Sequence, residues 1–257
     1  MIPISNLKVY TEGMKKSLED KLFFLPALRN NTPYIFDYGC ANGILLKEIK
    51  KRAPYISLIG YDQSEDMIKQ AKDNYNGDIL FTSSLQEAVS KIKPECTTLV
   101  LSSVIHEVYS YSNVKEIQTF WNFVLHTGFR YIVIRDFSIN EAVQREMIGK
   151  TEILKIENAD TYQDYCNKNG SIVTKRDLIH FLLKYRYKEN FEREVKENYL
   201  PLTTKALLKI IDDGGYKYKV IYQKNYTLPF LKQKVKEDFI LDLDDYTHIN
   251  LILKLRG

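Results

Sequence analysis

YIFDYGCANG, residues 34–43, is the stretch that decides the fold. An apolar run typical of a β-strand ends at Asp37, and Gly39 and Gly43 then flank a tight turn before the helical pattern of residues 44–53. Glycine permits backbone angles and close approaches that side chains forbid, and the start of a helix offers free N–H groups to a ligand. The Gly-x-x-x-Gly spacing differs from the Gly-x-Gly-x-x-Gly of dinucleotide enzymes, so it disfavours a nicotinamide cofactor.

A second signal follows about 20 residues later, the distance at which nucleoside-binding folds place an acidic residue. The run ISLIGYD, residues 56–62, predicts a second strand that ends at Asp62, and Ser64 opens a second helix. A carboxylate at this point can accept hydrogen bonds from both hydroxyls of a ribose. An acid at the start of a helix can also simply stabilise the helix dipole, but the glycine turn before it favours ligand binding.

Short apolar runs alternate with amphipathic stretches through the first half of the chain, which is the pattern of βαβ units around a mostly parallel sheet. Further strands are predicted at 79–84, 97–105 and 130–137, and a helix at 114–126. Beyond Phe137 the alternation stops, and Thr174 with Asp177 forms a capping-box pattern. A helix then begins near Thr203, and two runs with strand character follow at 216–223 and 247–257. We therefore expect a core of residues 1–137 and 201–257, with a helical cap inserted at 138–200.

This order of elements, with a closing pair of strands, resembles the class I S-adenosylmethionine-dependent methyltransferases. The resemblance covers most of the chain outside the predicted cap and is strongest over Tyr34 to Ala71. It implies a Rossmann-like three-layer α/β sandwich with a seven-stranded, mostly parallel sheet and an antiparallel C-terminal strand. It also implies S-adenosylmethionine (SAM) as cofactor, S-adenosylhomocysteine (SAH) as product, and methyl transfer as the reaction.

The resemblance also assigns cofactor contacts to particular residues. Asp37 would hold the ammonium group of SAM, the turn would wrap its amino acid portion, Asp62 would bind the ribose, and Gln63 and Met67 would lie beside the adenine. Ala41 stands where many relatives have glycine, and Ser83 or Ser84 stands where relatives often have an acid that contacts the adenine amino group. The full expected set is Asp37, Gly39, Cys40, Ala41, Asn42, Gly43, Asp62, Gln63, Met67, Ser83, Ser84 and Ser102.

The segment LVLSSVIHEVYSY, residues 99–111, places His106 and Glu107 at the carboxyl edge of the sheet, where open α/β folds bind ligands. Methyl transfer needs a base only when the acceptor carries a proton that must leave. His106 is the expected base, with Glu107 orienting it or acting itself, and packing beside the cofactor is the alternative role for His106. The Asp/Asn-Pro-Pro-Tyr motif of enzymes that methylate exocyclic amines is absent from the sequence. Arg135 and Asp136 are expected at the same edge, as substrate contacts or as a structural ion pair.

The acceptor stays open at this stage. A small molecule with an O or N nucleophile leads, and RNA follows because Lys184, Arg186 and Lys188 alternate with Tyr185 and Tyr187 in the predicted cap. A non-catalytic protein that keeps the fold is a third alternative. An N-terminal helix is expected to close the cofactor site, with Tyr10 and Lys16 as contacts.

Composition limits the remaining classes. Hydrophobic residues make up 44% of the chain and charged residues 27%, with a net charge of +4. No apolar run approaches the roughly 20 residues that cross a bilayer, and no export signal is seen, so we expect a cytoplasmic protein without membrane partners. The three cysteines and four histidines lack ligand spacing. The sequence therefore predicts reduced thiols and no metal site.

Overall fold

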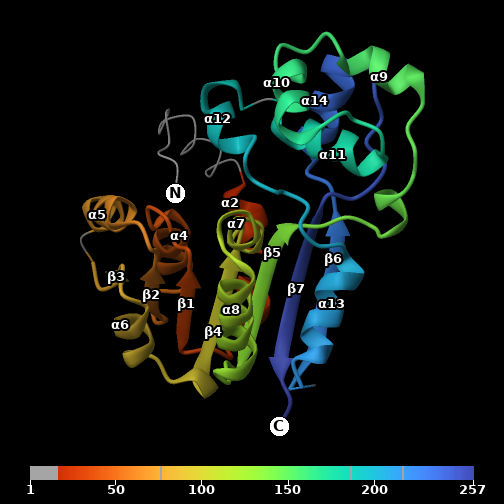
Figure 1. The fold of residues 1–257 in the computed structure, drawn as a ribbon. Coiled ribbons are helices and arrows are strands. Elements are labelled where there is room, and N and C mark those ends of the chain that lie inside the picture. Colours follow the sequence, from red (N-terminus) through yellow and green to blue (C-terminus); the bar gives the residue numbers. More distant parts are fainter. Residues whose placement is uncertain (1–16, 76, 186, 216) are drawn as a thin grey trace.

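The computed structural model describes residues 17–75, 77–185, 187–215 and 217–257, and its centre is one seven-stranded sheet in the order β3-β2-β1-β4-β5-β7-β6 (Figure 1). The strands are β1 (Tyr34–Tyr38), β2 (Ser57–Tyr61), β3 (Leu80–Thr82), β4 (Thr97–Ser102), β5 (Tyr131–Phe137), β6 (Tyr218–Tyr226) and β7 (His248–Leu255). The first five strands pair in parallel, and β7 lies antiparallel to both β5 and β6. The predicted fold class, including the antiparallel C-terminal strand, is confirmed.

Helices cover both faces of the sheet, because its strands are apolar on both sides. The longer ones are α4 (Ile44–Arg52), α5 (Glu65–Asn74), α6 (Leu85–Ser90), α7 (Ile105–Tyr111), α8 (Val114–His126) and α13 (Thr204–Asp213). Two short helices, α2 (Leu18–Lys21) and α3 (Leu25–Leu28), precede β1, and a 3-10 turn, η1 (Pro94–Cys96), precedes β4. Adjacent residues of β1 belong to different layers. Phe36 is in the hydrophobic cluster with α7, α8 and α13, whereas Ile35 is in the cluster with α2 to α5.

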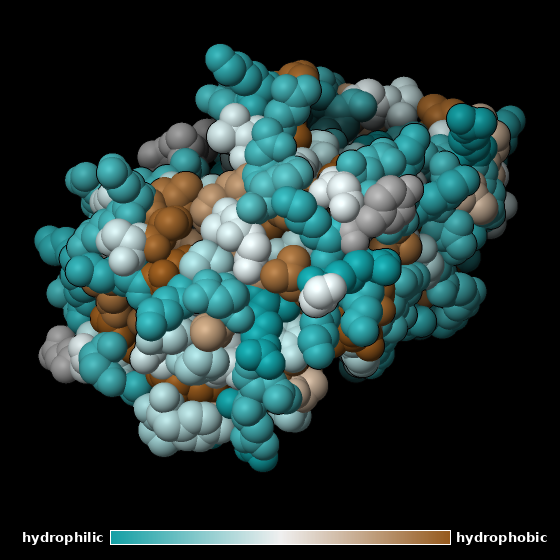
Figure 2. All heavy atoms as spheres, turned by 90° about the horizontal axis from the view of Figure 1, so that it is seen from below, coloured by the Kyte–Doolittle hydropathy of each residue, from teal (hydrophilic) through white to brown (hydrophobic). Residues whose placement is uncertain are grey.

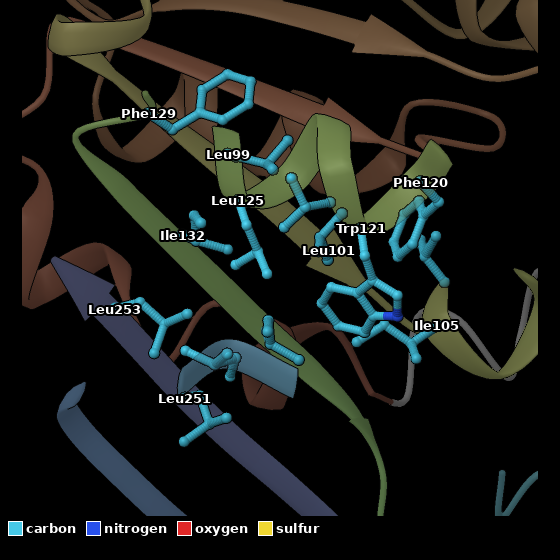
Figure 3. Packing of buried hydrophobic residues seen from close by; sticks show 14 of the residues in the cluster. Leu99, Leu101, Ile105, Phe120, Trp121, Leu125, Phe129, Ile132, Leu251 and Leu253 are labelled. Carbon is cyan, nitrogen blue, oxygen red and sulfur yellow. The ribbon is translucent and has the colours of Figure 1, made fainter. Parts of the chain in front are cut away.

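Figure 3 shows the first of these layers, in which leucines of β4 and β7 belong to one cluster with the aromatic side chains of α8. Leu99 and Leu101 of β4 are fully buried there, beside Phe120 and Trp121. Burial of large side chains on this scale contributes about 1.5–3 kcal/mol for each side chain. The layer thus fixes α7, which carries His106 and Glu107, against the carboxyl end of β4.

A separate group of helices lies beyond the carboxyl ends of β4 and β5 (Figure 1). It consists of η2 (Ala142–Gln144), α9 (Lys150–Ile156), α10 (Tyr162–Asn169), α11 (Lys175–Lys184), η3 (Lys188–Asn190), α12 (Phe191–Glu194) and α14 (Pro229–Phe239). The capping box predicted at Thr174 and Asp177 is present at the start of α11. The sequence left α14 unassigned, yet its Leu231, Val235 and Phe239 pack in the same hydrophobic cluster as α10 and α11. The division into a core and a cap at 138–200 stays a prediction.

The opposite end of the molecule, at the amino ends of the parallel strands, looks different (Figure 2). Its surface is mostly hydrophilic, with apolar side chains in small separate groups. Within the described residues, no helix combines the length and apolar character needed to cross a membrane.

Candidate functional site

A cavity of about 1180 Å³ lies at the carboxyl ends of the parallel strands, between the sheet and the cap. Its walls come from the turn after β1, the end of β2, α7, the segment around α12, and α14. The predicted site residues that line it are Asp37, Gly39, Cys40, Ala41, Asp62, Gln63, Met67, Ser102, His106 and Glu107. The cavity thus brings together most of the residues selected from the sequence.

The turn after β1 has the backbone that its glycines predict. Gly39 and Gly43 have φ angles of 81° and 74°, and Ala41 also lies in the left-handed region at 46°. A Cβ on Gly39 would come within 2.7 Å of Val104 Cγ2, so only glycine fits there. The amides behave differently from our expectation, because those of Gly39 and Cys40 both donate to the Tyr61 carbonyl and that of Gly43 to the Cys40 carbonyl. The turn offers close approach to a ligand, while these N–H groups hold the turn in place.

Asp62 links this turn to the end of β2. Its Oδ2 accepts from the Ala41 amide at 2.9 Å, and its Oδ1 accepts from the Ser64 amide at 2.9 Å. Burial raises the pKa of the Asp62 carboxyl, and the two amide hydrogen bonds oppose that rise. Each carboxylate oxygen keeps a further lone pair that can accept from a ligand hydroxyl. The glycine turn and the strand-end acid therefore meet at one place in the cavity wall.

Asp37 is almost completely buried at the end of β1, with an exposed fraction of 2%. Burial raises its pKa to about 7; the Lys21 ammonium lowers that value and the Asp62 charge adds to it. Among the described residues no hydrogen bond reaches the Asp37 carboxylate, although it lines the cavity. Such a group is suited to a cationic ligand. Sequence reasoning missed Lys21, which also lines the cavity; Tyr10 and Lys16, named instead, lie outside the described residues.

The side of the cavity expected to hold the adenine is only partly as predicted. Gln63 and Met67 line it, together with Leu85 of α6. Ser83 and Ser84 are not among the lining residues, and the Ser84 hydroxyl instead caps α6 by accepting from the Glu87 amide. Asn42 and Gly43, also predicted from the sequence, are not among the residues that line the cavity. Ser102 lines the cavity, and its buried hydroxyl has no hydrogen-bond partner among the described residues.

His106 is buried at the start of α7 and held by Asp136, whose Oδ1 lies 2.7 Å from the Nδ1 atom of His106. Burial alone would lower the pKa of His106, but the charge and hydrogen bond of Asp136 raise it to about 9. The base role predicted for His106 needs the neutral ring, because an imidazolium has no lone pair for a proton. Arg135 pairs with Asp20 and donates to Ser103, while Asp136 pairs with His106, so the structural role considered for both residues from the sequence is present.

Glu107 meets residues of the cap that the sequence did not single out. Arg193 donates to Glu107 Oε1 at 3.4 Å and to Glu197 Oε1 at 3.1 Å. Burial, followed by the charge of Glu197, raises the pKa of Glu107 to about 7. Tyr199 stacks on Phe137 at 4.4 Å and closes this wall with Glu194. The only sequence signal for these residues is the acidic and basic run FEREVKE, which is also typical of a solvent-exposed helix.

The residues present fit the cofactor that the sequence resemblance implies. Asp37 is a buried carboxylate without a hydrogen bond from the described residues, which suits the ammonium group of SAM. Gly39 presents bare backbone to the cavity, because Val104 Cγ2 fills the place where a Cβ would lie. Asp62 is placed to accept from the ribose, and the apolar side chains of Met67 and Leu85 suit the adenine ring.

Comparisons with known proteins agree with this reading. Residues 36–122 match the family model described as a methyltransferase domain. No curated protein matches the chain. Similar solved structures include the methyltransferase domain of bacterial CtHen1 (TM-score 0.51, 14% identity, 94% of this chain and 99% of that chain covered). The plantazolicin methyltransferase BamL, solved with a triazolic desmethyl analogue and SAH, is also similar (TM-score 0.54, 12% identity, 97% and 90% covered).

The magnesium protoporphyrin IX methyltransferase of Synechocystis PCC 6803, solved with bound SAH, has a TM-score of 0.51 at 12% identity, with 95% of this chain and 84% of that chain covered. At such identities these likenesses show the fold, and the methyltransferase-domain match covers the turn, Asp62 and the His106 segment within it. The chain thus contains a match to a methyltransferase domain over residues 36–122, and its fold and site support SAM-dependent methyl transfer.

Proposed function

We propose that this methyltransferase transfers the methyl group of SAM to an O or N nucleophile of a small molecule that binds between the strand ends and the cap. The acceptor would lie against His106 and Glu107, with Phe137 and Tyr199 beside it. Arg193, Glu194 and Glu197 from the cap complete the chamber. The expected cytoplasmic location stays a prediction.

The burial of the cap's basic and aromatic residues is the observation that carries this choice of acceptor. Lys184 has no exposed surface, and Tyr185 is also buried, with its hydroxyl bonded to Asp238. Lys188 is exposed but pairs with Asp160, and Tyr187 lines the cavity. Arg186 lies outside the described residues. A surface that binds RNA needs exposed cations and exposed aromatic rings, so this stretch supports a packed cap over a small ligand better than an RNA-binding stripe.

In the proposed complex, the protein mainly aligns the reactants and keeps water away from them. SAM supplies a methyl group that its sulfonium already activates. Asp37 would hold the ammonium group and Asp62 the ribose, so that the methyl group faces the acceptor side of the cavity. The stacked rings of Phe137 and Tyr199 would cover part of that side.

Isotope transfer tests the choice of acceptor directly. The chain is incubated with SAM labelled in its methyl group and with two fractions of a cell extract, total RNA and a small-molecule filtrate. We expect label in the filtrate products, with little dependence on salt. Label in RNA, falling steeply as salt rises, would refute the small-molecule acceptor, because phosphate contacts make RNA binding strongly salt-dependent.

The proposed role of Asp37 predicts how SAH affinity depends on pH. Since burial raises its pKa to about 7, the carboxyl is mostly protonated at pH 6 and binds an ammonium group poorly. Raising the pH through 7 ionises it, so the affinity for SAH should rise about tenfold between pH 6 and pH 8. Calorimetric titration measures this change. Asp37→Asn should bind weakly with a flat profile, and the exposed Asp78→Asn control should behave as the native chain. An unchanged slope in Asp37→Asn would contradict the role.

A further inference from the structure

The acceptor side of the cavity contains one imidazole and two carboxylates arranged around a common point. His106, Glu107 and Glu197 each offer a ligand atom, and these atoms lie within 4.8 Å of one another. His106 and Glu107 come from α7, whereas Glu197 follows α12 in the cap. All three line the cavity. Because 90 positions of sequence separate the two sources, ligand spacing along the chain gave no sign of this cluster.

Two of these ligand atoms belong to buried side chains and accept no hydrogen bond from the described residues. The Nε2 atom of His106 lies 3.7 Å from Glu197 Oε2, which exceeds hydrogen-bond distance. The other carboxylate oxygen of Glu197 accepts from Arg193 and Tyr111, so within the described residues Oε2 is left without a donor. With metal–ligand bonds of 2.0–2.2 Å, two ligands of one metal ion lie about 3 to 4.3 Å apart. The separation of 3.7 Å suits two ligands of one cation better than a direct bond.

The orientation of the His106 ring supports the same conclusion. Asp136 holds Nδ1 at 2.7 Å, and the second oxygen of Asp136 is fixed by the Ile105 amide. Metal-binding histidines are typically oriented by a carboxylate on the nitrogen that does not bind the metal. Asp136 lies outside the cluster and directs Nε2 toward Glu197, and a cation bound there would take the place of the Nε2 proton, since only the neutral ring has a lone pair for a metal ion. Glu107 has the most exposed side chain of the three, and its ligand atom lies within 4.8 Å of the other two.

Charge also favours a cation at this point. Glu194 and Asp136 lie close to the three candidate ligands, so four carboxylates share this wall with Arg193 and the deeper Lys184. Arg193 bonds to one oxygen of Glu107 and to one of Glu197, and both glutamates line the cavity. Buried carboxylates without full compensation are unfavourable, and a divalent cation relieves that excess.

We propose that His106, Glu107 and Glu197 bind a divalent cation that receives an oxygen of the acceptor, an inference that rests on the proposed acceptor chamber. Two carboxylates with one imidazole suit Mn²⁺ better than soft metals. A cation there lowers the pKa of an acceptor hydroxyl. The hydroxyl oxygen then forms the new bond to the methyl carbon, the carbon–sulfur bond breaks with its electron pair moving to sulfur, and the hydroxyl proton passes to water. The products are a methyl ether and SAH, so the proposal favours O-methylation.

Mn²⁺ binding tests the site without any need for the acceptor. Electron paramagnetic resonance and calorimetry should find one Mn²⁺ bound per chain, and Glu197→Gln should weaken binding at least about tenfold. Since Glu197 is buried beside Arg193, Glu107→Gln serves as a second variant with less risk to folding. Glu237→Gln, a glutamate of the same cavity outside the cluster, is the matched control and should bind Mn²⁺ normally. SAH titration of every variant confirms that the fold is intact.

If the native chain binds SAH but no Mn²⁺, the proposed cation site is wrong. Unchanged Mn²⁺ binding in both glutamine variants would also overturn it. A chelator should abolish methyl transfer into the filtrate while SAH still binds. Mn²⁺ binding lost in the variants, together with methyl transfer into RNA, would support the cation site and refute only the small-molecule acceptor.

Discussion

Asp62→Ala is expected to weaken the binding of SAH at least about a hundredfold, since each lost hydrogen bond to a charged acceptor contributes about 1.5–3 kcal/mol. Two effects combine in this variant. The ribose would lose a bidentate acceptor, and the glycine turn would lose the bond from the Ala41 amide that ties it to the end of β2. Calorimetric titration with SAH measures the loss.

Asp62→Asn separates the two effects. The amide oxygen can still accept from one backbone amide, so the turn keeps part of its support while the ribose loses a charged partner. We expect an affinity between those of the native chain and Asp62→Ala. Native affinity in Asp62→Ala would show that Asp62 does not hold the cofactor, and the assignment of the ribose site would fall.

The second large effect is expected from Arg193→Ala, which should lower the free energy of unfolding by about 3–5 kcal/mol. Arg193 is buried and bonds to both Glu107 and Glu197, so its removal leaves buried carboxylates without their cation. For a chain of this size, such a loss lowers the melting temperature by roughly 10 °C. Arg145→Ala, at an exposed position of the cap, is the control and should melt as the native chain.

The pH dependence identifies the cause of this loss. Burial, followed by neighbouring carboxylates, raises the folded pKa of Glu107 and of Glu194 to about 7, and removing Arg193 raises both further. Between about pH 4.5 and the raised pKa of these carboxyls, the folded variant keeps their protons while the unfolded chain has released them. The stability of the variant therefore falls as the pH rises through this range. Thermal melts should show a smaller loss at pH 5.5 than at pH 8. An equal loss at both values would point to lost packing instead.

The fold followed from the sequence because its signals are local. A β-run that ends in Asp37, a glycine turn and a helix are contiguous, and Asp62 follows one βα unit later. Parallel strands bring such strand ends to one edge, so neighbours in the sheet become neighbours in the site. Asp37 and Asp62 were predictable for that reason. Ser84 was not, because the same residue type serves as a helix cap, and local geometry gave it that role.

The acceptor side was less predictable for a physical reason. Arg193, Glu194 and Glu197 reach the cavity through the packing of the cap, and charged residues in a short helical run look solvent-exposed in sequence. Lys184 is a second case in which burial could not be predicted from the sequence. It was grouped with surface cations, but its ammonium group is buried and donates to the Val195 and Glu197 carbonyls. Tertiary packing, which a single sequence does not encode locally, decided both cases.

The packing of α14 against α10 and α11 constrains any attempt to trim or exchange parts of this enzyme. Leu231, Val235 and Phe239 lie in the segment that connects β6 to β7. They nevertheless belong to the same hydrophobic cluster as residues of the segment that follows β5. Excising residues 138–200 alone would expose these three side chains to water and invite aggregation. A chimaera that grafts a new acceptor specificity must therefore transplant both connections as a single unit.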